Sequence, residues 1–181
     1  MNNVQENRAQ YTQSAMIGML AVLSVQGFHV FEHVLQMFQR KVLHVDDGAG
    51  LLGRYLDLEP VHFGYNAAFT TLVVLVFIQG EYVAKRKAFP LAFALMTLLV
   101  AFQGWHMLEH VVRFVHYLDT GQSNGNGILG NLFGFGWLHL FYNGFGYVVF
   151  VLAFFAGQAH REIGVILIGV ILNRSRRTLP A

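Results

Sequence analysis

The octapeptide QGFHVFEH at residues 26–33 returns as QGWHMLEH at residues 103–110, and these two segments decide the fold. Each lies inside a long apolar stretch, so each is expected on a helix. At 3.6 residues per turn, positions i, i+3 and i+4 share one helical face. Each segment therefore gathers His, Glu and His within about one turn, on one side of its helix.

The spacing of 77 residues between these segments extends well beyond them. Without a gap, residues 15–80 align with residues 92–157, and 19 of the 66 aligned positions are identical. Shared Leu and Val are expected of any two apolar hairpins, whereas polar residues in register are not. Because the polar pairs keep one spacing, we predict a tandem repeat with two helices in each copy. These pairs are Gln26/Gln103, His29/His106, Glu32/Glu109, His33/His110, His62/His139, Tyr65/Tyr142 and Asn66/Asn143.

The composition indicates a membrane protein. Of the 181 residues, 55% are hydrophobic and only 12% are charged, against roughly 25% charged residues in soluble domains. A bilayer-spanning helix needs roughly 20 mostly apolar residues, and four stretches meet this need: 15–38, 61–83, 88–112 and 132–157. The absence of Cys excludes disulfides and thiolate metal sites. The net charge of +2 argues against nucleic acid as a partner.

We therefore predict an all-α integral membrane protein with four transmembrane helices. Two copies that enter the membrane from the same side would be related by a parallel pseudo-two-fold axis along the membrane normal. A polar N-terminal tail (1–14) would precede repeat 1 (15–85) and repeat 2 (88–160). Residues 161–181 are expected to form a short interfacial helix with a basic tail, because the apolar stretch 163–172 is too short to cross a bilayer.

The basic residues predict an orientation. The turn at residues 85–87 and the basic C-terminal tail fall on one side of a four-span protein, together with the N-terminus. By the positive-inside rule this side is cytoplasmic, in a bacterial inner membrane or a plasma membrane. The helical rise places His33 about 10 Å and His29 about 16 Å below Arg40. The site they belong to is therefore expected toward the outer leaflet.

The duplicated polar residues predict a metal centre inside the bundle. A charged side chain at the centre of a spanning helix costs roughly 2.5–3.5 kcal/mol, so it indicates a functional site, and bundles hold metals between facing helices. The predicted ligands are His29, Glu32, His33, His62, His106, Glu109, His110 and His139. The residues expected to hydrogen-bond to these ligands are Tyr65, Asn66, Tyr142 and Asn143. Both glutamates are also predicted as catalytic groups.

Nitrogen and oxygen donors without thiolate suit transition metal ions such as iron, copper or zinc. Two equivalent ligand sets around one axis favour a dinuclear, non-haem centre, close in type to the carboxylate and histidine sets of di-iron bundles. The predicted function is that of an enzyme, an oxidoreductase acting on a quinone or another lipid-soluble substrate. A polar network that only fixes helix register is the structural alternative.

The string His-x-x-Glu-His resembles the inverzincin motif, in which two His bind zinc and the Glu is the general base. The resemblance implies that His29 and His33, or the same pair in the second copy, bind zinc beside a glutamate base. The match covers five residues, occurs twice inside spanning helices, and has no further acidic ligand in the same span. The dinuclear centre is therefore favoured over zinc proteolysis.

Three further functions are open from the sequence. Haem b ligated across the axis, for example by His29 and His106, would make an electron-transfer subunit. A non-enzymatic accessory subunit of a larger membrane complex would need no substrate. A conduit for protons or metal ions could use the line of His and Glu. The three histidines without a counterpart in the other copy are expected in loops or at the interface: His44, His116 and His160.

Overall fold

The computed structural model describes residues 11–46, 48–123 and 125–165. Its elements, in chain order, are α1 (Gln13–Lys41), α2 (Gly53–Leu56), α3 (Glu59–Gln79), the 3₁₀ helix η1 (Ala84–Lys87), α4 (Pro90–Thr120), α5 (Gly130–Phe133) and α6 (Phe135–Ala156).

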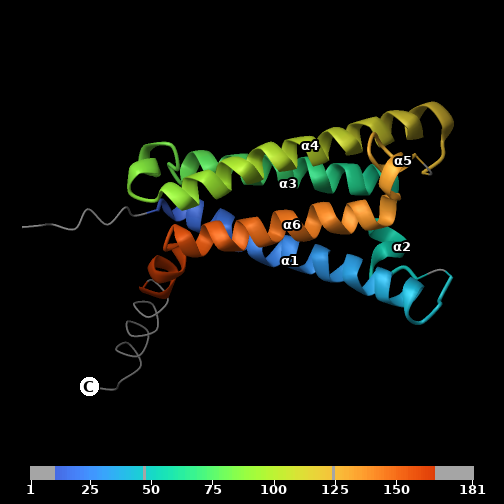
Figure 1. Cartoon of the computed structure of the whole chain (residues 1–181), viewed down its shortest axis with the longest axis horizontal. Coiled ribbons are helices and arrows are strands. Elements are labelled where there is room, and N and C mark those ends of the chain that lie inside the picture. The colour runs from blue at the N-terminus through green and yellow to red at the C-terminus, as the bar shows by residue number, and fades with distance from the viewer. Residues whose placement is uncertain (1–10, 47, 124, 166–181) are drawn as a thin grey trace, which may run out of the picture.

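The four long helices form an up-down-up-down bundle (Figure 1). α1 contacts α3 and α6, and α4 contacts the same two helices, so the four lie in a ring. The short helices α2 and α5 lie at one end of the bundle, and the basic η1 turn lies at the other. Both hairpins therefore turn at the α2/α5 end, as a tandem pair of two-helix units requires.

Local sequence signals explain where the helices begin and end. Thr12 caps α1 by accepting a hydrogen bond from the N–H of Ala15, which is the usual role of a threonine at this position. Pro60 and Pro90 stand in the first turns of α3 and α4, where the missing N–H costs nothing. Gly121 ends α4 in the left-handed conformation at φ +69°.

The predicted four spans are confirmed as four helices long and apolar enough to cross a membrane. α1 and α4 have 29 and 31 residues. At 1.5 Å per residue each is longer than a hydrocarbon core of roughly 30 Å, so their ends reach beyond it. α4 continues eight residues past Val112, where the predicted span stopped, because residues 113–120 contain no helix breaker.

The interior of the bundle has two layers. The half next to η1 is packed with apolar side chains, among them Val22, Val73, Met96, Leu99 and Phe150, each at most 1% exposed. The half next to α2 and α5 is polar, and its buried side chains are mostly His, Gln, Asn and Glu. In the same turns of α1, Phe28 and Phe31 face outward. Polar inside and apolar outside is the pattern expected of a bundle in lipid.

The tandem repeat and its pseudo-two-fold axis stay predictions, although several contacts described below recur at the spacing of 77 residues. Residues 1–10 of the predicted N-terminal tail, and most of the predicted interfacial helix at 161–181, lie outside the described residues.

Candidate metal centre

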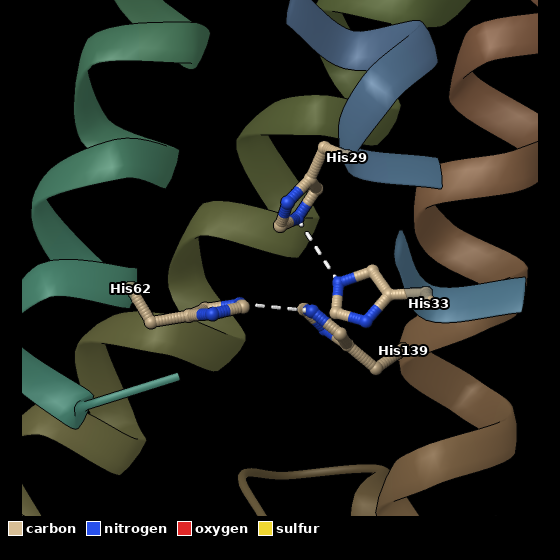
Figure 2. Close-up of side chains that lie close together, drawn as sticks. All are labelled: His29, His33, His62 and His139. Atoms are coloured by element: carbon tan, nitrogen blue, oxygen red, sulfur yellow. Dashed lines mark hydrogen bonds between the residues drawn. The ribbon is translucent and has the colours of Figure 1, made fainter. Parts of the chain in front are cut away.

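Six buried histidines from all four long helices meet in the polar half of the bundle. α1 supplies two, α3 one, α4 two and α6 one, and each is at most 9% exposed. Ligand nitrogens of His29, His33, His62 and His139 all lie within 4.8 Å of one another (Figure 2). Those of His106, His110 and His139 form a second group by the same measure. His139 belongs to both groups, which places two potential metal positions side by side.

Within each helix the i, i+4 spacing brings two imidazoles together. The Nε2 atoms of His29 and His33 are 3.0 Å apart, and those of His106 and His110 are 3.1 Å apart. The two pairs lie 77 residues apart in the sequence, and they have the same geometry because each has the same i, i+4 spacing on its helix. Each pair presents its nitrogens toward the bundle axis, where the single histidines of α3 and α6 lie.

His139 lies at the centre of the cluster and contacts histidines of both groups. Its Nε2 lies 2.9 Å from Nε2 of His62, and its Nδ1 lies 3.4 Å from Nε2 of His106. The ring of His33 is 4.5 Å away between centroids and that of His110 is 5.2 Å away. His139 therefore touches imidazoles from α1, α3 and α4, and both of its nitrogens face other histidines.

These separations fit metal coordination. With metal–nitrogen bonds of about 2.0–2.1 Å, two nitrogens on one ion lie about 2.9–3.4 Å apart. Hydrogen-bonded imidazoles have similar spacing. The other nitrogens of the α4 pair, Nδ1 of His106 and Nδ1 of His110, have no hydrogen-bond partner among the described residues. Buried polar atoms without partners are rare and costly, and a metal-bound imidazole nitrogen is one way to remove that cost.

The four tyrosine and asparagine residues predicted around the ligands lie against the cluster. Asn143 places its Nδ2 3.2 Å from Nε2 of His139 and accepts a hydrogen bond of 2.8 Å from Gln26. Tyr65 donates to the other end of Gln26 at 2.9 Å. This chain of hydrogen-bonded side chains links α1, α3 and α6 on the η1 side of His29.

The remaining two members of this group make matching contacts. Asn66 donates to the backbone oxygen of His62 at 2.9 Å, as Asn143 does to that of His139, also at 2.9 Å. The ring of Tyr142 stacks on His106 with centroids 4.7 Å apart. Tyr142 therefore contacts an imidazole ring directly, whereas Asn66 bonds to the backbone of the helix that carries His62.

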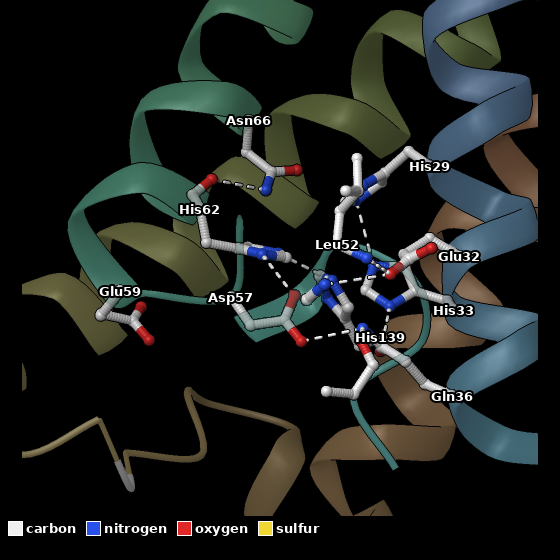
Figure 3. A network of polar contacts seen from close by, with 12 residues as sticks. His29, Glu32, His33, Gln36, Leu52, Asp57, Glu59, His62, Asn66 and His139 are labelled. Atoms are coloured by element: carbon white, nitrogen blue, oxygen red, sulfur yellow. Dashed lines mark hydrogen bonds and ion pairs between the residues drawn. The ribbon is translucent and has the colours of Figure 1, made fainter. Parts of the chain in front are cut away.

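Both predicted glutamate ligands point to the loops. Oε1 of Glu32 accepts hydrogen bonds from the backbone N–H groups of Leu52, at 2.6 Å, and Gly53, at 3.0 Å (Figure 3). Glu109 accepts 2.5 and 2.9 Å bonds from the N–H groups of Ile128 and Leu129. Both histidine groups contain imidazole nitrogens only. In this arrangement the carboxylates anchor the loops that lead into α2 and α5.

The glycine-rich segments of the sequence explain how the loops approach these carboxylates. Gly50 and Gly127 have φ values of +71° and +75°, a region that glycine adopts without strain. A Cβ atom at Gly50 would collide with the carboxylate of Glu32, and one at Gly127 with that of Glu109. Only glycine therefore lets the backbone close over each glutamate.

A group of charged and amide side chains lies beside the histidines. Helical spacing places Gln36 on the face of His29 and His33, whereas sequence reasoning missed Asp57. Oε1 of Gln36 accepts a hydrogen bond from Nδ1 of His33 at 3.0 Å, and its Nε2 donates to Asp57 at 2.8 Å. Asp57 lies 3.8 Å from Nδ1 of His62, and burial raises the pKa of its carboxyl group. A carboxylate behind a histidine is a common way to orient a metal ligand.

The same edge carries a buried ion pair between α3 and α4. Arg113 donates to Oε2 of Glu59 at 2.6 Å, and both side chains are nearly fully buried. Helical spacing places Arg113 on the same face as His106 and His110, whereas the only signal for Glu59 was that acidic groups stand just before the second span. The alignment of the two predicted copies could not find Asp57 and Glu59, because the residues 77 positions away are glycines.

The three histidines without a counterpart 77 residues away, His44, His116 and His160, belong to neither histidine group. His44 lies in the loop after α1 with φ +53°, and His116 lies on α4.

The chain matches no protein-family model, no curated protein and no solved structure.

Proposed function

We propose that this protein is an integral-membrane metalloprotein in which the six clustered histidines bind two metal ions. One observation carries the proposal: six buried imidazoles form two groups that share His139, with ligand nitrogens of each group within 4.8 Å of one another. Six buried imidazoles in the interior of a membrane bundle would otherwise be an expensive collection of polar groups.

The proposed chemistry is oxidation–reduction. An all-imidazole set suits copper, iron or zinc. Two copper or iron ions held there would supply oxidation of a substrate, whose two electrons and two protons would convert dioxygen to hydrogen peroxide. The protein's own contribution is to orient the imidazoles, through Gln36 at His33, Asn143 at His139 and the ring of Tyr142 at His106. It also keeps the site inside a narrow polar compartment. In our proposal, Glu32 and Glu109 hold the surrounding loops by accepting hydrogen bonds from their backbone N–H groups.

The packing of the rings favours separate metal ions over haem. Centroid separations within the cluster run from 4.4 Å for His29–His33 to 6.2 Å for His29–His139. A macrocycle held between α1 and α4 would have to enter space that His62 and His139 fill.

The apolar layer favours a closed site over an ion conduit. Toward η1 the interior beyond Gln26 and Gln103 is filled by fully buried Val22, Met96 and Leu99. Within the described residues, the polar side chains therefore occupy one half of the bundle and leave the other half apolar.

Elemental analysis of the purified protein tests the proposal. After expression with iron, copper, zinc and manganese supplied, we expect about two transition metal ions per chain and no Soret band. His139→Ala should lower the metal content by at least half, because both groups use this residue.

His44→Ala is the matched control, since His44 lies outside both groups, and its metal content should equal that of the wild type. A wild-type protein with almost no transition metal would overturn the proposal, and a Soret band would replace it with haem binding.

A further inference from the structure

A polar pocket lies beside the histidine cluster at the α2/α5 end of the bundle. Its volume is about 210 Å³. The lining includes the exposed side chains of Arg40 and Ser123 and, at its other end, three buried histidines: His33, His62 and His139. A molecule in this pocket would therefore reach from the surface of the protein to three of the four histidines in the first group.

The pocket exists because the two halves of the chain differ there. The position 77 residues after Glu59 is Gly136, which lines the pocket. A Cβ atom at Gly136 would have Met37 Sδ as its nearest neighbour, at 3.8 Å, so the glycine leaves open space. The histidines are matched between the two copies, whereas the residues that shape this pocket are not. Two equivalent metal positions do not need this difference between the two halves of the chain. A pocket that opens on one side of the histidine cluster does need it.

Charge and hydrogen bonding in the lining define the ligand. Arg40 and Arg113 stand against Asp57 and Glu59, so the formal charges of these four side chains cancel. The proposed metal ions would add positive charge at the histidine end of the pocket. Oε1 of Glu59, in a side chain 2% exposed, has no hydrogen-bond partner among the described residues. This acceptor calls for an O–H or N–H donor on the ligand.

We propose that the pocket binds the substrate of the metal centre, a small polar molecule that donates a hydrogen bond to Oε1 of Glu59 and arrives from water at the α2/α5 end. The inference rests on the proposed function and names its substrate class. It replaces the lipid-soluble substrate expected from the sequence, because the route to the histidines is lined by polar side chains.

Access from water is tested with cysteine substitutions, for which the natural absence of Cys provides a clean background. Gly136→Cys places a thiol on the pocket wall. Gly144→Cys, on the same helix, is the matched control because a Cβ there meets no atom within 4 Å. In sealed vesicles, trimethylammonium-ethyl methanethiosulfonate should modify the first variant at least tenfold faster than the second when added on the α2/α5 side. Equal rates would overturn access through the pocket, whether or not metal is bound.

Ligand binding is tested on the copper(II)-loaded protein with imidazole, at a pH where imidazole is neutral and carries one N–H donor. We expect a change in the absorption spectrum on titration. Gly136→Trp, which fills the pocket, should weaken imidazole binding at least tenfold while the copper content stays at the wild-type value. Glu59→Gln/Arg113→Gln, which keeps the net charge of the lining, should also weaken it.

The outcomes separate the two proposals. Unchanged imidazole binding in copper-replete Gly136→Trp overturns the pocket as substrate site but leaves the metal centre standing. A wild-type protein that holds no metal overturns the proposed function, and the substrate assignment falls with it.

Discussion

Within each His-x-x-Glu-His string, the histidines and the glutamate have different partners. Successive residues on an α-helix are rotated by about 100°, so Glu32 lies at the edge of the face that His29 and His33 share. From that edge its carboxylate reaches the loop amides of Leu52 and Gly53. Both N–H groups donate to Oε1, and hydrogen bonds to a charged acceptor of this kind are strong, while the buried Oε2 of Glu32 has no partner among the described residues.

Replacing the loop-anchoring carboxylates tests this role. Glu32→Gln and Glu109→Gln should each lower the free energy of unfolding by about 1–3 kcal/mol, because hydrogen bonds to a charged acceptor are stronger than those to an amide. Metal content should not change. Unfolding in detergent and elemental analysis measure the two effects. Glu81→Gln, at an exposed glutamate, is the control. Loss of metal with unchanged stability would instead support the ligand role predicted from the sequence.

At the scale of elements, α3 and α4 are joined by the buried pair of Glu59 and Arg113. α3 brings its acidic residue in the first turn, and α4 brings its basic residue two turns before its end. Neither side chain has access to much water, so each charge depends on the other. A buried pair of this kind adds little net stability, but the loss of one partner is severe.

Breaking this pair from one side should be strongly destabilising. Arg113→Ala leaves the Glu59 carboxylate buried without its counter-ion, and we expect a loss of about 3–5 kcal/mol in the free energy of unfolding. Unfolding by sodium dodecyl sulfate in mixed micelles measures it. Glu59→Gln/Arg113→Gln removes both charges and should cost clearly less than the single change. A double variant as unstable as Arg113→Ala would contradict the mutual dependence of the two charges.

At the scale of the whole molecule, the histidine cluster and the pocket lie in the half of the bundle that ends at α2 and α5, and the basic turn η1 lies at the opposite end (Figure 1). Lys85, Arg86 and Lys87 concentrate positive charge at that end. The positive-inside rule favours short loops of this kind on the cytoplasmic side. The pocket would then open away from the cytoplasm.

Epitope tags test this orientation in bacterial spheroplasts, from which the outer membrane barrier has been removed. A tag inserted between Gln122 and Ser123, in the α4–α5 loop, should bind antibody added from outside. A tag inserted between Arg86 and Lys87 should bind only after permeabilisation, because the basic turn is expected in the cytoplasm. The reverse labelling pattern would contradict the orientation, and the pocket would then face the cytoplasm.

The sequence by itself determined the four spans, the polar faces of α1 and α4, and the identity of the six histidines. Helix length, periodicity and the i, i+4 spacing are local properties, so residues 26–33 and 103–110 carry them wherever the helices pack. The tertiary structure decided which side chains meet. His139 belongs to both histidine groups. Glu32 and Glu109 bond to loop amides, and Glu59 bonds to Arg113. These contacts depend on the rotation and offset of one helix against another, which spacing along a single chain does not fix.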